Sequence, residues 1–186
     1  MYLLIVLIVI LLIIFWLIGI YNRIIRLRNR RQNAFADIDV QLRQRHDLVP
    51  QLVESVKGYA THERELLTKI TEARAAAMSA STIDEKIKTE TQLTSALQGL
   101  KVAVEAYPDL KANQNFLQLQ QELTDIENKL AAARRFFNAA TFEYNTGIET
   151  FPSNMIANSF GFGRENMFDL GDSRPEMEEP PKISFK

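Results

Sequence analysis

The 186-residue chain contains no cysteine, and its only two histidines are His46 and His62. Without cysteine it cannot form a disulfide framework, a thiolate metal site, a cysteine nucleophile or a lipidated cysteine anchor. Long stretches that alternate between apolar and polar residues with a period of two are also missing, so strands are not expected. Because the lack of cysteine fits a reducing compartment without proving one, the compartment has to be inferred from the arginines.

Motifs for catalysis or metal binding are scarce as well. His62 and Glu63 begin like the helix motif of zinc proteases, but the segment HEREL has no second histidine four residues after the first. The simpler interpretation is a pair of polar residues near a helix start, where Glu63 gains from the helix dipole. Gly161-Phe162-Gly163 lacks the lysine of a phosphate-binding loop. We therefore expect no enzyme activity and no catalytic, cofactor-binding or metal-binding residues.

One long apolar run is present, from Tyr2 to Ile20, and no second run is long enough to cross a membrane. As a helix it would span about 29 Å, which matches the hydrocarbon core of a bilayer. A cleaved signal peptide would need a charged region before the run and a small-residue cleavage site after it. Neither pattern is found, so we expect an uncleaved transmembrane anchor over residues 1–21.

Arginines follow the apolar run closely, and they predict its orientation. Flanks rich in Lys and Arg stay in the cytoplasm, so the N-terminus is expected outside and the remaining domain inside. At this position arginines favour anionic lipid headgroups over nucleic acid, which would need aromatic platforms or a basic face away from the membrane. Trp16 and Tyr21 are expected as interfacial aromatics. The predicted lipid-contacting residues are Trp16, Tyr21, Arg23, Arg26, Arg28, Arg30 and Arg31.

Beyond the anchor the hydrophobic pattern is helical. Apolar residues recur in alternating steps of three and four from Phe35 to Ala77 and from Phe116 to Phe151, with a shorter stripe from Leu93 to Tyr107. Breaks are expected at residues 78–82, at Tyr107-Pro108 and at Phe151-Pro152.

The point left open is whether the first helix ends near Gly58. A continuous helix agrees with the unbroken heptad phase, whereas a reversal gives helices of compatible length. We favour the reversal. The predicted fold is all-α, with an N-terminal transmembrane helix followed by an elongated antiparallel four-helix bundle over residues 22–152.

Polar residues inside the apolar seams are candidates for setting the register of the bundle. Arg45 lies in the first seam, where a charge needs solvent or an acidic partner on a facing helix. Asp39 is expected to pair with Arg43, four residues on. The predicted registry residues are Asp39, Arg43, Arg45, Glu63, Asn128, Arg134 and Asn138. Tyr144 and Asn145 belong to the same polar set, which predicts either an interhelical hydrogen-bond network or a surface for a partner.

The end of the chain has a different composition. Residues 153–168 are rich in Phe, Met, Gly and Asn, and they could pack on the bundle, lie at the membrane surface or contact a neighbouring protomer. Residues 169–186 are rich in proline and charge, so a flexible tail is expected.

At this point the residues carry a resemblance. YNRIIRLRNRRQNAFADIDVQLRQRHDLVPQLVESVKGYATHE, then EAYPDLKANQNFLQLQQELTDIENKLAAARRFFNAATFEYNTGIETFP and FGF, resemble the LemA family of bacterial membrane proteins from Tyr21 to about Phe168. The combinations IDVQL, GYATHE and YPDLKAN make the match specific. The resemblance implies a single-pass protein of the bacterial inner membrane with a four-helix domain and no established enzyme activity. A similar branch takes part in building magnetosome membranes, and family genes often neighbour those of membrane proteases.

These observations predict a non-enzymatic, membrane-anchored helical scaffold that self-associates and helps to organise a membrane. The expected partners are membrane lipids and further copies of the chain, with a membrane protein as a further candidate, but not nucleic acid; no cofactor is expected. The alternative is an adaptor or regulator of a membrane protease or signalling protein. The enzyme interpretation would be revived if function required His62, Glu63 and Arg45 together in variants that still fold normally.

Overall fold

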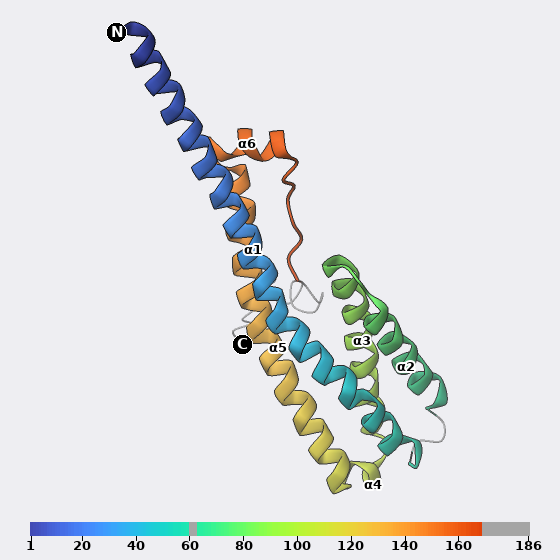
Figure 1. The fold of residues 1–186 in the computed structure, drawn as a ribbon. Coiled ribbons are helices and arrows are strands. Elements are labelled where there is room, and N and C mark those ends of the chain that lie inside the picture. The colour runs from blue at the N-terminus through green and yellow to red at the C-terminus, as the bar shows by residue number, and fades with distance from the viewer. Residues whose placement is uncertain (60–62, 169–186) are drawn as a thin grey trace, which may run out of the picture. The chain divides into compact units, whose positions relative to one another are not determined.

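Figure 1 shows the fold of the chain in a computed structural model, which describes residues 1–59 and 63–168. The described residues form α-helices and no strands: α1 (Tyr2–Lys57), α2 (Arg64–Ser79), α3 (Ile83–Val104), α4 (Pro108–Lys111), α5 (Gln114–Glu149) and α6 (Ser153–Phe160). The all-helical prediction is therefore confirmed. His62 and the tail from residue 169 lie outside the described residues.

The chain divides into two compact units. The terminal unit comprises residues 1–42 and 127–167, and the central unit begins at Arg43 and runs to Ile126. The terminal unit therefore contains the start of α1, the end of α5, and α6. The central unit contains the end of α1, the start of α5, and the three helices between them.

The central unit is built around one hydrophobic core. Apolar positions three or four residues apart place one face of each helix inward. The core takes Leu48, Val49, Leu52, Val53 and Val56 from α1, Leu67, Ile70 and Ala77 from α2, Leu93, Leu97, Leu100 and Val104 from α3, Leu110 from α4, and Phe116 and Ile126 from α5. Four helix segments and the short α4 thus share this core. Whether one four-helix arrangement extends over residues 22–152 stays a prediction.

The breaks between these helices follow local chemistry. α1 ends at Lys57 and passes through Pro50 without a break. Arg74 of α2 donates from Nε to the carbonyl of His46 on α1 at 2.6 Å, so α2 runs back along α1. This is the reversal near Gly58 that the helix lengths favour. Thr82 and Glu85 form a capping box at the start of α3.

One break was not predicted. No break is expected from the sequence between Pro108 and Phe151, but the chain forms the short α4, passes through Asn113 and then begins α5. Asn113 accepts a hydrogen bond from the amide of Phe116 through Oδ1, as helix-capping asparagines do. Proline at the start of α4 and this cap explain why α4 and α5 begin as separate helices.

In the terminal unit α1 and α5 lie side by side (Figure 1), and α6 packs against both. Ile24 of α1 meets Tyr144 and Ile148 of α5, together with Ile156 and Ala157 of α6. Further along, Phe35 and Phe137 pack edge to face with ring centres 5.5 Å apart. Helix α6 was not predicted, because its eight residues are too few to display a helical period clearly.

Candidate functional site

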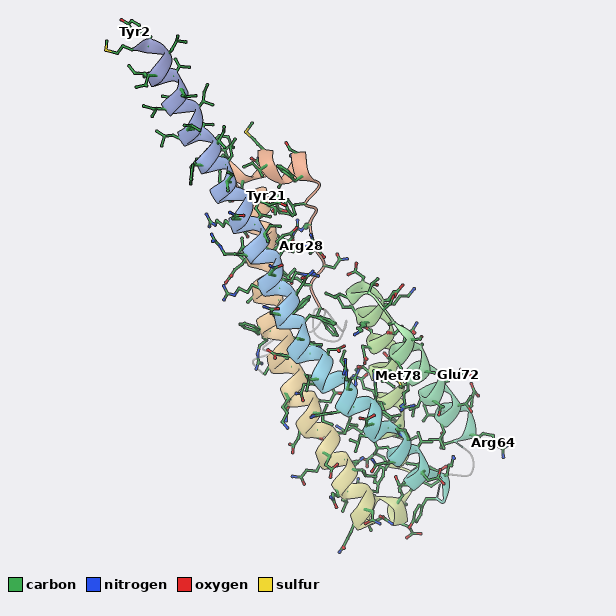
Figure 2. The ribbon with its side chains drawn as sticks, in the orientation of Figure 1. Tyr2, Tyr21, Arg28, Arg64, Glu72 and Met78 are labelled. Carbon is green, nitrogen blue, oxygen red and sulfur yellow. The ribbon has the colours of Figure 1, made fainter. Side chains whose placement is uncertain are left out.

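The first candidate surface is the N-terminal part of α1. Its residues from Tyr2 to Ile18 are exposed, and the side chains project on all sides of the helix until Tyr21, where other elements begin (Figure 2). By length and composition α1 is the one helix in the described residues that could cross a membrane. The exposed apolar surface of this segment suits the hydrocarbon core of a bilayer, where a helix satisfies its own backbone hydrogen bonds.

The arginines after this run divide into two groups. Arg23, Arg26 and Arg28 are exposed, and the exposed Arg30 pairs with Glu143 of α5. Arg31 was expected to contact lipid, and this expectation is wrong. Its side chain is buried, donates from Nε to Thr141 at 3.1 Å, and lies over the ring of Phe137. The helical period explains the difference, because Arg31 falls on the face of α1 that α5 covers.

The two predicted interfacial aromatics also differ. Trp16 is exposed, as a side chain within an unpartnered helix must be. Tyr21 is half-buried, and its ring packs on Phe160 at 4.9 Å and on Phe162 at 5.8 Å between ring centres. Tyr21 therefore holds the C-terminal segment on α1 and offers only part of its surface to a membrane.

The segment after α6 lies along the terminal unit, and we call residues 161–167 the C-terminal strap. Tyr144 donates its hydroxyl to the carbonyl of Gly163 at 3.1 Å. Asn145 makes two hydrogen bonds of 2.9 Å with the backbone of Glu165, donating through Nδ2 and accepting at Oδ1. Arg31 donates to the carbonyl of Asn166 at 3.1 Å and pairs with the Glu165 carboxylate. Side chains of α1 and α5 thus replace the backbone partners that the strap lacks.

The hydroxyl of Tyr144 stays a donor because burial raises its pKa, and the nearby Glu165 carboxylate raises it further. Tyr144 and Asn145 were expected in a network between the first and last helices. Instead they bind the strap, which occupies the polar side of α5. The sequence contains no periodic signal for this contact, since the strap has no regular secondary structure.

The second candidate feature is a cluster of buried charged groups in the central unit. Arg45 pairs with Glu90 of α3, and both side chains are essentially inaccessible, at 0% and 1% exposure. His46 Nε2 lies 2.6 Å from the other Glu90 oxygen, and Arg45 also donates to Thr94 at 3.1 Å. A guanidinium and a carboxylate in contact offset much of their mutual desolvation cost. These contacts link α1 to α3, and their role in fixing the register of the two helices stays a prediction.

Arg45 therefore has the acidic partner on a facing helix that its place in the seam requires. The sequence did carry a signal for that partner, because Glu90 lies three residues before Leu93 and so continues the apolar stripe of α3. Glu63 accepts a hydrogen bond of 3.3 Å from the hydroxyl of Tyr107. Asp39, Arg43, Arg134 and Asn138 each interact with a neighbouring group, whereas Asn128 is exposed. Their role in registry stays a prediction.

The chemistry of these features is structural. Among residues 1–59 and 63–168 no three His, Asp or Glu side chains are grouped so that they could hold a metal ion. Glu90 and His46 are in close polar contact, and both side chains are buried. The accessible features are the exposed apolar helix and the surface of the terminal unit around α6.

An exposed apolar helix that continues into packed helices defines a class: an all-α, membrane-associated protein with one candidate N-terminal membrane helix. The family model for the LemA family matches residues 34–185. The chain belongs to the LemA family.

Curated relatives agree with this assignment. The chain is 31% identical to Protein LemA of Metamycoplasma hominis over 142 residues, which cover 75% of this chain and 64% of the relative. It is 23% identical over 174 residues to the magnetosome protein MamQ of Magnetospirillum gryphiswaldense, covering 80% of this chain and 64% of that protein. A MamQ protein of Paramagnetospirillum magneticum matches at 22% identity with the same coverage. The chain thus spans about two thirds of the length of these relatives.

Proposed function

We propose that this protein is a non-enzymatic scaffold of a bacterial inner membrane, anchored by the start of α1 and associating with further copies of itself. The carrying observation is the continuity of α1. The same helix that exposes an apolar run also buries Ile24, Phe35 and Ile38 in the terminal unit. Because no flexible linker separates the candidate span from this packing, the terminal unit would be held in a fixed orientation to the bilayer.

The division into parts that goes with this proposal is an anchor over residues 1–21, a helical bundle over 22–152, a C-terminal segment over 153–168 and a tail over 169–186. The N-terminus would lie outside and the bundle in the cytoplasm. The exposed arginines Arg23, Arg26 and Arg28 support this orientation, because they follow the apolar run directly and would meet anionic headgroups.

Self-association is supported by exposed aromatic side chains on the end of α5. Phe136 is 48% exposed and Phe142 is 61% exposed. Aromatic side chains provide a large contact area at low entropic cost and often anchor protein interfaces. Confinement to a membrane raises the effective concentration of the chains, so even weak lateral contacts can build assemblies. The MamQ relatives are named as magnetosome proteins, and this supports a role in organising a membrane.

The test measures particle mass for the full-length protein extracted from membranes with a polymer that retains lipid. We expect discrete assemblies larger than one subunit, and single subunits for a variant that begins at Asn22. A double substitution, Phe136→Ser with Phe142→Ser, should shift the full-length protein toward single subunits. The control is Val102→Ser on α3, which removes a more exposed apolar side chain, at 74%, from the central unit.

Single subunits in every full-length sample would overturn self-association. If the same extract contained one heterologous membrane protein in a fixed ratio, the function would be that of an adaptor or regulator. Assemblies that persist unchanged in the double variant would retain the scaffold but place its contacts elsewhere.

A further inference from the structure

α6 and the residues around it carry no charge. From Thr150 to Gly163 the sequence is TFPSNMIANSFGFG, which contains no Asp, Glu, Lys, Arg or His, whereas Glu149 and Arg164 border it on either side. The two bordering side chains pair with each other, with 3.4 Å between Arg164 Nη1 and Glu149 Oε1. An uncharged stretch of this length on the surface of a protein with many charged residues calls for a neighbour other than water.

One face of α6 is occupied by protein. Ile156 and Ala157 are buried against Ile24 of α1 and Ile148 of α5. The helix ends at Gly161, which has a φ of 72°, and the amide of Phe162 donates to the carbonyl of Ala157 at 2.9 Å. A left-handed glycine at this point ends the helix as C-terminal caps commonly do.

The other face of α6 is exposed and uncharged, and Met155 shares it with the polar Asn158 and Ser159. Met155 is 63% exposed, and Phe151, in the turn before the helix, is 79% exposed. Met155 and Ala157 are two residues apart, which places them about 200° apart around the helix axis. Phe160 at the end of α6 is 64% exposed although its ring contacts Tyr21. Three large apolar side chains are therefore largely exposed within ten residues of chain.

The position of α6 along α1 indicates what lies against the exposed face of α6. α6 packs at residues 20–27 of α1, through Ile20, Tyr21, Ile24 and Leu27. The exposed apolar run of α1 ends at Ile18, so the contact begins where that run ends. Figure 1 shows α6 crossing α1 at this level rather than running parallel to it. If the apolar run spans the bilayer, α6 is held at the bilayer surface.

We propose that α6 is an interfacial helix that binds the lipid surface, with Phe151, Met155 and Phe160 inserted among the headgroups. The inference rests on the membrane anchor in the proposed function. A helix of this kind lies in the plane of the interface with its apolar face buried about 5–10 Å into the boundary of headgroups and acyl chains. An interfacial α6 would resist tilting of α1, because tilt would move α6 out of the interface or into the hydrocarbon.

The test uses the absence of native cysteine. Single-cysteine variants Met155→Cys and Phe151→Cys of the full-length protein carry a nitroxide spin label in lipid vesicles, and the accessibility of each label to oxygen and to a polar nickel chelate is measured. Oxygen dissolves in lipid, whereas the chelate stays in water. We expect the oxygen-to-nickel ratio to be at least about threefold higher at position 155 than in water, since an interfacial helix inserts its apolar face.

Two further labelled positions make the result decisive. Val102→Cys is the control, because Val102 is an apolar side chain of α3 that is 74% exposed and belongs to the central unit. Ile10→Cys lies in the middle of the apolar run and reports on the anchor. Val102→Cys should read as water-exposed and Ile10→Cys as lipid-exposed. Circular dichroism of each variant confirms that the helical content is retained.

A lipid reading at Ile10 with a water reading at positions 151 and 155 would overturn the interfacial helix and leave the anchor intact. A water reading at Ile10 would overturn the anchor and the inference that rests on it. Low accessibility of position 155 to both reagents would also overturn the inference, because it would place protein and not lipid against α6.

Discussion

At the residue scale, Arg45 and Glu90 form a salt bridge between two inaccessible side chains of the central unit. Thr94 and His46 occupy further hydrogen-bonding positions around them. A buried ion pair contributes little net stability over an apolar pair of similar volume, but removing one partner leaves an uncompensated charge. We therefore expect the pair to contribute specificity more than stability, and substitutions can test this.

Glu90→Gln should lower the free energy of unfolding by about 3–5 kcal/mol, because it leaves the Arg45 charge unpaired in the core. Thermal unfolding of the full-length protein in detergent, followed by circular dichroism, checks this. Glu65→Gln on α2 is the control: its carboxylate pairs with Lys69 at the surface, and the change should leave the melting temperature nearly unchanged.

Replacing both partners separates stability from registry. Arg45→Met with Glu90→Met should recover most of the lost stability, since no charge then remains unpaired. If the Glu90→Gln variant were as stable as the unmodified protein, Arg45 and Glu90 would not be shielded from water, and the structure would be contradicted at this point.

At the element scale, the pairing of α1 with α5 includes one close approach at a glycine. Gly147 is the one residue that interrupts the apolar seam of the last helix, and the structure explains it. A Cβ atom added at Gly147 would lie 2.5 Å from Cδ1 of Leu27 on α1, so the leucine occupies the space that a side chain would need. The glycine at position 147 thus leaves the space that the Leu27 side chain of the facing helix occupies.

Gly147→Leu should destabilise the terminal unit by about 1–3 kcal/mol, as overpacking of a core does. Gly147→Ala should be nearly neutral, because Leu27 can turn aside and alanine is the better helix former by about 1 kcal/mol. The melting temperatures of the two variants provide the comparison.

A further variant, Leu27→Ala, completes a double-mutant cycle with Gly147→Leu. Combined with Gly147→Leu it should be more stable than the sum of the two single changes predicts, because the new leucine fills the vacated space. Strict additivity would mean that these two positions do not meet.

Also at this scale, the helix starts and stops were the features that sequence could reveal. Pro108, the capping box at Thr82 and the end of α1 before Gly58 all act within a few residues of themselves. α6 was missed because eight residues are too few to display a helical period clearly. The strap was missed because its position depends on Tyr144, Asn145 and Arg31, more than 15 residues away in the chain. Short-range chemistry can be seen in a window of sequence, whereas such contacts cannot.

At the scale of the whole molecule, orientation is the property that the arginines predict. Exposed arginines follow the apolar run. Such flanks remain on the cytoplasmic side. The N-terminus and the central unit should therefore lie on opposite sides of the membrane.

Cysteine labelling tests this orientation without a background reaction, because the chain has no cysteine of its own. In intact spheroplasts, a membrane-impermeant maleimide should label Tyr2→Cys but not Ser95→Cys, which is exposed on α3. After lysis Ser95→Cys should become reactive, and this serves as the control for accessibility. Labelling of Ser95→Cys in intact spheroplasts would reverse the orientation.

The sequence by itself determined the all-helical class, the apolar run at the start of α1, the main breaks between helices and the need of Arg45 for an acidic partner. Periodicity, turn residues and the cost of a buried charge act locally, so they can be recognised without coordinates. Only the tertiary structure decided that Glu90 is that partner, that Arg31 turns inward toward Thr141, and that α6 packs at the end of the apolar run. These outcomes depend on which helix faces meet, and that choice is made by the packing of residues far apart in the chain.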